Sequence, residues 1–237
     1  MTGASAPAGG WQDARVLQVI DETSRARTLR LQLATPIRHW PGQHYVVRLT
    51  APDGYTASRS YSVASGPDDR GVIDLTVERL DDGEVSTFLH DVVVPGDELE
   101  VRGPIGGWFV WNGRDPALLV GGGSGVVPLM AMMRHARATG AAGLLHLVVS
   151  VRSPAMLYYR SEMDGPDVDV VYTREAPPGD ARGPGRVRLS DLSPHVRTGG
   201  AAYVCGAPAF CDAVTGLLLE AGVDSTLVRV ERFGASG

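Results

Sequence analysis

Apolar and polar residues alternate in short runs through the first half of the chain, which is the pattern of strands that bury one face. Turn formers separate the runs, for example at Pro41-Gly42, Pro52-Asp53-Gly54 and Asp81-Asp82-Gly83. Short strands joined by such turns predict an antiparallel barrel of about six strands. The predicted strands cover residues 15–20, 28–33, 44–49, 58–64, 72–80 and 98–101.

The pattern changes after Asp115-Pro116, where apolar runs become continuous and helical periods intervene. Continuous apolar runs at 117–120 and 144–149 are typical of strands that are covered on both faces and pair in parallel. We therefore predict an N-terminal antiparallel six-stranded barrel over residues 1–113 and a Rossmann-like α/β domain with a parallel sheet over residues 114–237. In this second domain the expected helices cover 126–138, 155–163 and 209–221, and further strands cover 168–172, 202–205 and 227–230.

The composition is that of a globular protein and excludes several kinds of chemistry. Of the 237 residues, 43% are hydrophobic and 21% are charged, which is enough apolar material for buried cores. All 22 residues counted as lysine or arginine are arginine, so neither a Schiff-base lysine nor a P-loop lysine is available. The net charge of -5 offers no basic field, and we expect no nucleic-acid partner.

The two cysteines, Cys205 and Cys211, are too few for a ferredoxin-type iron–sulfur cluster or a disulfide framework. Any such cluster would therefore belong to a partner protein. This cysteine usage suits a reducing cytoplasm. The six histidines, including His39 and His44, show no metal-ligand constellation in the sequence, and no metal is predicted.

No segment has the pattern of a signal peptide or a membrane span. Residues 1–10 lack a basic segment followed by an apolar one and are expected to form a frayed start. The long uncharged stretch at 117–133 contains several glycines and Pro128 in its middle, so a strand, a turn and a helix explain it better than a membrane span.

A glycine-rich run at 121–128 follows an apolar strand and opens a helix. Gly121, Gly123 and Gly125 would let backbone amides approach a phosphate, and the helix dipole favours negative charge at that point. A flexible strand-to-helix turn explains the run equally well when it is taken alone, because the full Rossmann glycine spacing is absent.

Residues 122–161 contain no Asp or Glu. A dinucleotide fold specific for NAD usually places a carboxylate after its second strand, where it binds the ribose hydroxyls. Ser150 and Arg152 occupy that region here, and Arg174 follows the next predicted strand. The two arginines can hold a 2′-phosphate through charge-assisted hydrogen bonds, with solvated surface arginines as the alternative.

In the barrel half, the segment Arg59-Ser60-Tyr61-Ser62 places Arg59 and Tyr61 on one face of a strand and the two serines on the other. The functional interpretation gives Arg59 a phosphate, Tyr61 a planar ring to cover and Ser62 a ring nitrogen. An ordinary exposed strand is the alternative.

The segment Gly83-Glu84-Val85-Ser86 begins a helical stretch that runs to about Asp91. The first amides of such a helix have no internal acceptor and can bind a pyrophosphate. An ordinary capped helix is the alternative.

Taken together, these segments resemble the ferredoxin–NADP reductase family, in which a flavin-binding barrel precedes a pyridine-nucleotide domain. The order matches over most of the chain, from about Trp11 to Gly234. The segments that carry the resemblance are Pro41-Gly42-Gln43-His44, Arg59-Ser60-Tyr61-Ser62, Val77-Glu78-Arg79, Gly83-Glu84-Val85-Ser86, Gly103-Pro104-Ile105-Gly106, the run 121–128, Tyr203-Val204-Cys205-Gly206 and Glu231-Arg232-Phe233-Gly234.

The resemblance implies a site residue by residue. Arg59 would pair with the flavin pyrophosphate, Tyr61 would pack on the isoalloxazine, and Ser62 would approach its N5. Phe233 would shield the flavin face until the nicotinamide displaces it, although the chain continues past it to Gly237 instead of ending on an aromatic residue. The flavin-binding set is Arg59, Ser60, Tyr61, Ser62, Val77, Arg79, Gly83, Val85, Ser86 and Phe233.

For the nicotinamide dinucleotide, the resemblance gives Arg152 and Arg174 the 2′-phosphate, with Tyr158 or Tyr159 near the adenine. Cys205 would lie beside the nicotinamide, by proximity and not as a nucleophile, because its strand offers no electropositive activation. The implied catalytic set is Ser62, Cys205 and Glu231. The nucleotide-binding set is Gly121, Gly123, Gly125, Pro128, Ser150, Arg152, Tyr158, Tyr159, Arg174 and Gly206.

The implied enzyme is an NADPH-dependent flavoprotein reductase that receives a hydride on FAD and passes single electrons to a separate ferredoxin or oxygenase component. FMN and NADH are the alternative cofactors. The cluster-bearing ferredoxin domain that is fused in many relatives is absent from the sequence, so the resemblance is to the stand-alone unit. Two other functions are considered: a reductase of free flavin, a quinone or another small acceptor, and a non-catalytic flavin- or nucleotide-binding subunit of a larger complex.

Overall fold

The computed structural model describes residues 9–234, and the chain passes from one compact unit to a second at Val110 and Trp111. Residues 1–8, which include most of the expected frayed start, and residues 235–237 lie outside the described part. The domain limits expected from the change of sequence pattern, 1–113 and 114–237, stay a prediction.

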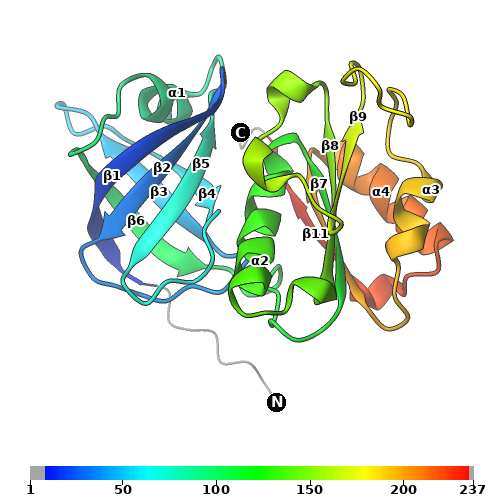
Figure 1. Cartoon of the computed structure of the whole chain (residues 1–237). Helices are drawn as coiled ribbons and strands as arrows, with labels where there is room; N and C mark the ends of the chain where they lie inside the picture. The colour runs from blue at the N-terminus through cyan, green and yellow to red at the C-terminus, as the bar shows by residue number, and fades with distance from the viewer. Residues whose placement is uncertain (1–8, 235–237) are drawn as a thin grey trace. The chain divides into compact units, whose positions relative to one another are not determined.

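Six antiparallel strands form the first unit (Figure 1). Hydrogen-bonded neighbours follow the order β4-β3-β6-β1-β2-β5, and Val63 adds an isolated antiparallel bridge to Leu75 that joins the two edges. The sheet therefore closes on itself, which confirms the predicted six-stranded antiparallel barrel. Its strands are β1 (Trp11–Thr23), β2 (Ala26–Leu33), β3 (His44–Thr50), β4 (Thr56–Ser62), β5 (Val72–Glu78) and β6 (Glu98–Ile105).

Alternate side chains of these strands fill the barrel, as the sequence pattern requires. In β2, Leu29 and Leu31 are buried, while Arg30 between them is partly exposed. Helix α1 (Glu84–Asp91) adds Val85 and Leu89 to the same core. Each fully buried leucine or valine contributes about 1.5–3 kcal/mol relative to solvent exposure, so the closed barrel is held mainly by this core.

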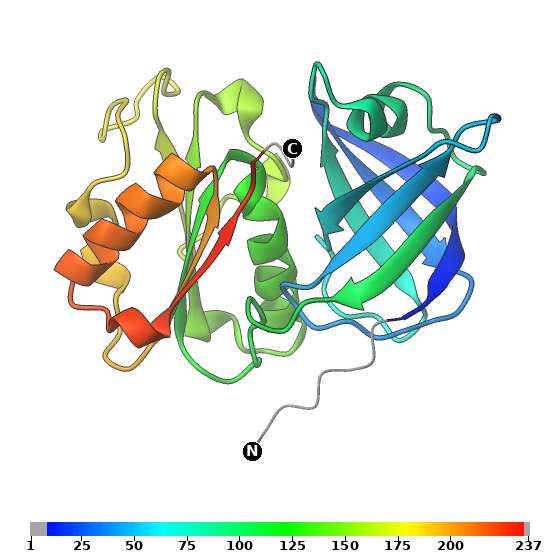
Figure 2. The same cartoon turned by 180° about the vertical axis from the view of Figure 1, so that it is seen from behind.

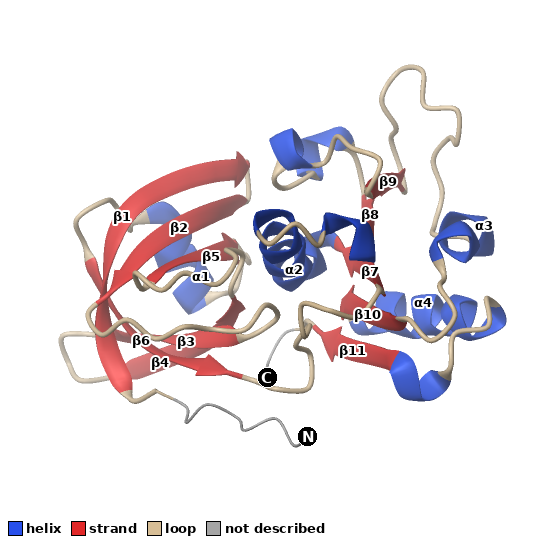
Figure 3. Cartoon of the chain, turned by 60° about the horizontal axis from the view of Figure 1, so that its bottom comes forward, coloured by secondary structure: helices blue, strands red, loops and turns tan. Residues whose placement is uncertain are grey.

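The second unit is a five-stranded parallel sheet with helices on both faces, which confirms the predicted Rossmann-like α/β fold. Figure 3 shows α2 on one face and α3 and α4 on the other, and Figure 2 shows α4 beside β11. The strand order is β11-β10-β7-β8-β9. The elements are β7 (Ala117–Gly122), α2 (Val126–Ala138), β8 (Leu145–Val151), β9 (Val168–Tyr172), α3 (Leu189–Leu192), β10 (Ala201–Gly206), α4 (Pro208–Glu220) and β11 (Val228–Arg232).

Coverage on both faces explains the continuous apolar runs. Leu118, Leu119 and Val120 are all buried although consecutive residues of β7 point to opposite faces. On the α4 face, Val214 and Leu218 share one buried cluster with Leu118 and Val120. The sequence of these strands therefore shows no alternation.

The predicted helix over 155–163 is wrong. The segment instead forms two short 3-10 helices, at Pro154–Met156 and Arg160–Glu162, with Tyr159 in the left-handed region at φ 51° between them. Leu157, Tyr158 and Tyr159 are all buried. The left-handed backbone at Tyr159 interrupts any right-handed helix here, and the burial of this residue holds the irregular path in place.

Other short elements were not expected from the sequence. They include α3 and the 3-10 helices η1 (Gly123–Gly125), η2 (Ala142–Leu144), η5 (Ser193–His195) and η6 (Ser225–Leu227). Over residues 9–234, none of the helices has the length and apolar character that crossing a membrane requires.

Candidate functional site

The strand order of the second unit reverses between β7 and β10. Strands β8 and β9 extend the sheet on one side of this pair, and β11 extends it on the other. The connections that leave β7 and β10 lead to α2 and α4 on opposite faces of the sheet (Figure 3). In open α/β sheets, ligands bind beyond the carboxyl ends of the strands at such a switch point. The turn after β7 and the end of β10 therefore define a candidate site.

Glycine is required in the turn after β7 for two physical reasons. Gly123 has φ 56°, in the left-handed region that residues with a side chain rarely adopt. The space around its Cβ position is open, so the backbone conformation and not a steric contact requires glycine here. Gly125 is buried, and a Cβ atom there would lie closer than 3.0 Å to the carbonyl oxygen of Cys205. The turn thus brings the start of α2 directly against the end of β10, and the first turn of α2 carries no acidic residue.

Several predicted site residues meet at the end of β10. The amide of Phe233 donates to the carbonyl oxygen of Gly206 at 2.8 Å, so the chain after β11 is held at the same edge of the sheet. Pro128 is buried in the first turn of α2. The structure therefore brings the glycine turn, Gly206 and Phe233 together.

Cys205 and Glu231 are register partners in β10 and β11. Burial raises the pKa of the Cys205 thiol well above its ordinary value, and the nearby Glu231 carboxylate raises it further. The thiol therefore stays protonated at neutral pH, which agrees with an apolar role next to a ligand and not with a nucleophile.

Glu231 carries a buried carboxylate oxygen, Oε2, for which the described residues provide no hydrogen-bond partner. Burial also raises the pKa of Glu231 to about 7. A carboxyl group with that pKa changes protonation near neutral pH, and its unpartnered oxygen can accept or share a proton with a bound ligand.

The carboxyl ends of β8 and β9 bring Arg152 and Arg174 together. The amide of Arg174 donates to the carbonyl oxygen of Arg152 at 3.0 Å, and the amide of Glu175 donates to the same oxygen at 3.1 Å. Both arginine side chains are exposed, and neither forms an ion pair within residues 9–234. The nearby Ser150 is buried in β8. The backbones of two exposed arginines therefore meet at the end of the sheet where a phosphate is expected.

Tyr158 and Tyr159 are less accessible than the sequence suggested. Both side chains are buried, and their rings pack edge to face with 6.2 Å between centroids. The guanidinium of Arg134 also covers the Tyr159 ring at 4.6 Å. Stacking near an adenine stays a prediction for these residues, and it would require one ring to leave its present contacts.

In the first unit, Arg59 and Tyr61 share one face of β4, opposite Val47 and Tyr45 of β3. Tyr61 packs on the barrel core, and its burial raises the pKa of its phenol while the Arg59 charge lowers it. Arg59 is exposed on this face, and its guanidinium donates only to the carbonyl oxygen of Ser58 at 2.8 Å. An arginine without a carboxylate partner in the described part of the chain is available to an anion.

The serines of this segment differ in exposure. Ser60 and Ser62 lie on the other face of β4, where Ser60 is exposed and Ser62 is buried opposite His44. Ser62 is the last residue of β4 and follows Tyr61 in the chain, and its hydroxyl is shielded from water. A hydrogen bond from Ser62 to a ring nitrogen stays a prediction.

The entry to α1 is fixed by a closed turn. The hydroxyl of Ser86 accepts from the amide of Leu80 at 3.2 Å and donates to the carbonyl oxygen of Gly83 at 3.1 Å. Val85 is anchored in the barrel core. The first amides of α1 lack intrahelical acceptors, and no side chain caps them, so they remain available to an anion.

Val77 and Arg79 have structural partners that the sequence did not indicate. Val77 is completely buried in the barrel core. Arg79 forms ion pairs with Asp91 at 3.0 Å and Asp81 at 3.2 Å. A role at a flavin stays a prediction for both residues, because their present contacts already explain them.

The sequence shows no metal-ligand constellation among the histidines, but the structure brings two of them together with a carboxylate. The side chains of His146, Asp169 and His195 converge, with their potential ligand atoms within 4.8 Å of one another. Their separations along the chain gave no signal, because the three residues come from β8, β9 and η5.

Comparison with known proteins identifies the two units. The oxidoreductase FAD-binding domain family matches residues 13–110, and the oxidoreductase NAD-binding domain family matches residues 119–216. In overall fold, the chain is similar to the FAD/NAD-binding domain of nitric oxide dioxygenase from Vibrio cholerae, with a TM-score of 0.81 and 23% identity over 96% of this chain and 99% of that one.

Two curated relatives are more similar in sequence. A ferredoxin–NAD(P)+ reductase component of naphthalene 1,2-dioxygenase and salicylate 5-hydroxylase systems from Ralstonia sp is 31% identical, covering 92% of this chain and 68% of the relative. A glycine betaine monooxygenase reductase subunit from Chromohalobacter salexigens is 32% identical, covering 96% of this chain and 65% of the relative. The chain thus spans about two thirds of the length of these proteins.

Proposed function

The chain belongs to the ferredoxin–NADP reductase family of flavin-dependent oxidoreductases, and from this premise we propose that it is the NADPH-dependent reductase of a separate ferredoxin or oxygenase component. FAD supplies the redox chemistry when it is bound, since it accepts two electrons as a hydride from the nicotinamide and releases them singly. The observation that carries the proposal is the succession of an FAD-binding and an NAD-binding domain over most of the chain.

In the proposed flavin site, within residues 1–113, Arg59 pairs with the pyrophosphate and Tyr61 covers the ring system. The unpaired Arg59 guanidinium and the uncapped amides of α1 support this assignment, because both offer positive character to an anion. Ser62 would donate to a ring nitrogen. Ser60, Val77, Arg79 and the segment from Gly83 to Ser86 complete the proposed set.

In the proposed nucleotide site, within residues 114–237, the glycine turn lets the dinucleotide approach the backbone at the start of α2. Arg152 and Arg174 hold the 2′-phosphate, which would make NADPH the preferred donor and NADH the weaker one. Their adjacency and their lack of carboxylate partners in residues 9–234 support this preference. Glu175 adds a carboxylate nearby, so the preference depends on two positive charges outweighing one negative charge.

Glu231 and Cys205 would act next to the nicotinamide. The protonated Cys205 thiol provides apolar bulk that excludes water. The carboxyl group of Glu231, with its unpartnered oxygen and its pKa of about 7, would hold a proton at that position. Phe233, tied to Gly206 through its amide, would cover the flavin until the nicotinamide arrives.

The acceptor is proposed from the relatives, whose names describe reductase components of oxygenase systems. Cys205 and Cys211 are the cysteines of these two domains, and two thiolates are too few to hold an iron–sulfur centre within them. We also propose a cytoplasmic location, which the two free, buried cysteines support because a reducing compartment keeps thiols free.

An anaerobic titration tests the function. The purified protein, supplied with FAD, should show a flavin absorbance that bleaches with NADPH and recovers in stopped-flow mixing with a [2Fe–2S] ferredoxin. Recovery with free flavin or a quinone, and none with ferredoxin, would favour a small-acceptor reductase. Bound flavin that neither NADPH nor NADH reduces would favour a non-catalytic subunit, and protein that takes up no flavin would contradict every version of the proposal.

A further inference from the structure

Three ligand-type side chains from separate elements converge in the second unit. The Nε2 atom of His146 lies 2.8 Å from Oδ2 of Asp169, and the Nε2 atom of His195 lies 2.9 Å from the same oxygen. The two imidazole rings stack in parallel, with 3.4 Å between centroids and 7° between planes. Two ring nitrogens therefore contact the same carboxylate oxygen, which lies between the planes of the stacked rings.

This cluster is far along the sheet from the proposed nucleotide site. His146 is the second residue of β8 and Asp169 is the second residue of β9, so both lie at the amino ends of parallel strands. The glycine turn and Arg152 follow the carboxyl ends. The function proposed above therefore does not use the cluster.

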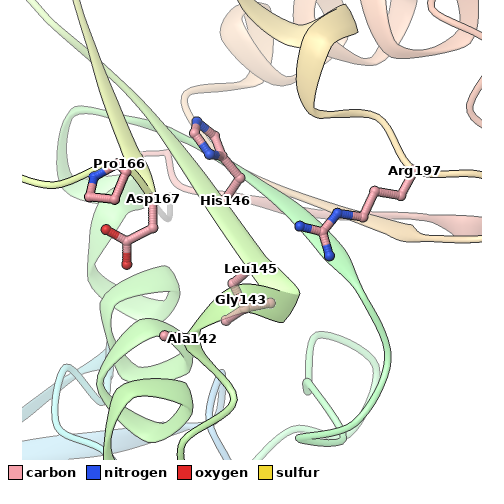
Figure 4. A pocket seen from close by; sticks show the side chains of 7 residues that line it. All are labelled: Ala142, Gly143, Leu145, His146, Pro166, Asp167 and Arg197. Carbon is pink, nitrogen blue, oxygen red and sulfur yellow. The ribbon is translucent and has the colours of Figure 1, made fainter.

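The cluster is accessible on its carboxylate side. The side chains of His146 and His195 are 14% and 24% exposed, whereas that of Asp169 is 53% exposed. His146 also lines an open pocket of about 420 Å³ (Figure 4). Solvent can therefore reach the ligand atoms without any change in the backbone.

The groups around the pocket do not form a second acidic cluster. Asp167 is already paired with Arg137 at 3.1 Å. Arg197 lines the same pocket and contributes a positive charge (Figure 4). Among the described residues near the pocket, the donor atoms that converge are therefore those of His146, Asp169 and His195.

The donor set has a recognisable chemistry. Two imidazole nitrogens and one carboxylate oxygen are the ligands that Zn²⁺ and similar divalent transition metals prefer, with metal–ligand distances of about 2.0–2.2 Å. Three protein ligands leave one tetrahedral position for water. An ion bound by the three groups would replace the two direct contacts to Oδ2 by three coordinate bonds, and the stacked imidazole rings would tilt apart so that each Nε2 lone pair points at it.

We propose that His146, Asp169 and His195 form a binding site for one divalent transition-metal ion of the zinc class. The ion would join β8 and β9 to η5, which follows α3 and is flanked by Leu192 and Val196 of the hydrophobic cluster on that face of the sheet. Its role would be to fix the segment around α3 and η5 on the sheet, so its loss should affect stability before it affects electron transfer.

Zinc titration of the full chain with its flavin bound tests the proposal without an activity readout. After treatment with a chelator and removal of the chelator, isothermal titration with ZnCl₂ should show one saturable site. Asp169→Asn and His195→Gln should each weaken it by at least about tenfold, since even the loss of a group that only supports a metal ligand typically costs about 10–100-fold in affinity. Zinc should raise the thermal midpoint of the parent and leave that of Asp169→Asn unchanged.

The matched control is His90→Gln. His90 also contacts a carboxylate, Asp91 at 2.7 Å, but belongs to no three-ligand cluster in residues 9–234, so the variant should bind zinc as the parent does. If His195→Gln does not fold, as judged by circular dichroism and the flavin spectrum, Asp169→Asn provides the test with a nearly isosteric change. The proposal is overturned if the parent binds no zinc saturably, or if zinc binds Asp169→Asn as tightly as the parent.

Discussion

Gly125 packs against the backbone of Cys205 so closely that a Cβ atom at position 125 would lie within 3.0 Å of the Cys205 carbonyl oxygen. This contact sets the distance between the start of α2 and the end of β10. The proposed nucleotide site depends on it, because amides of the turn after β7 reach a phosphate only if the helix begins at this place.

Gly125→Ala should therefore destabilise the second unit and weaken NADPH binding together. A methyl group forced into a packed backbone contact typically costs about 1–3 kcal/mol. Gly143→Ala is the matched control, because nothing lies within 4 Å of its Cβ position, and its cost should stay within about 0.5 kcal/mol. Urea unfolding and an NADPH titration of both variants check this, and equal behaviour of the two would contradict the contact.

The sequence predicted the strands of both units because burial leaves a direct mark on it. Alternation in β2 reports one buried face, and the unbroken apolar run in β7 reports two. The change between these patterns separates an antiparallel barrel from a parallel sheet. The helices α2 and α4 were predicted to within about one residue for the same reason, since their periods are regular.

Features that depend on tertiary neighbours were not predictable. The sequence pattern predicted that Tyr158 and Tyr159 belong to a helix. Packing instead buries both side chains, and Tyr159 has a left-handed backbone conformation. Arg79 was predicted to contact the flavin. Its ion pair with Asp91 depends on how α1 packs against the barrel, which the sequence does not show. The histidine cluster requires the order β7-β8-β9 together with the return of the chain at η5, which no spacing in the sequence encodes.

Arg59→Ala should reduce flavin retention. Removing a charged hydrogen-bond partner costs about 1.5–3 kcal/mol, which corresponds to about 10- to 150-fold in the dissociation constant. Arg15→Ala controls for the loss of an exposed arginine without an ion pair in the same unit. Fluorescence titration of the flavin-free proteins with FAD measures both constants, and an unchanged affinity in Arg59→Ala would remove this residue from the site.

Substituting Arg152 and Arg174 together by alanine should reduce the preference for NADPH over NADH. Two charge-assisted contacts to the 2′-phosphate are lost, while contacts to the rest of the dinucleotide remain. We expect the ratio of kcat/KM for the two donors to fall by at least about tenfold, or 1.4 kcal/mol. Arg114→Ala, which changes an exposed arginine at the start of the second unit, should keep the parental ratio. A parent enzyme that prefers NADH would contradict the assignment of both arginines.

Glu231 should make stability depend on pH in a definite direction. Burial raises its pKa from 4.5 to about 7 in the folded chain. Between these values the folded protein holds a proton that the unfolded chain releases, so the free energy of unfolding falls as pH rises from about 4.5 to 7. The stabilisation is fully present below pH 4.5 and lost above pH 7, with an upper limit of about 3.5 kcal/mol from about 1.4 kcal/mol per unit of pKa.

Glu231→Gln should remove this contribution, because the amide has the shape of the protonated carboxyl group and does not titrate. The difference in unfolding free energy, variant minus parent, should therefore increase from pH 5 to pH 8 in favour of the variant. Urea unfolding without nucleotide at these two pH values measures it, and Glu220→Gln, at the exposed end of α4, controls for the change of net charge. Parallel pH profiles of Glu231→Gln and the parent would show that Glu231 ionises normally, and the proton assigned to it next to the nicotinamide would then have no support.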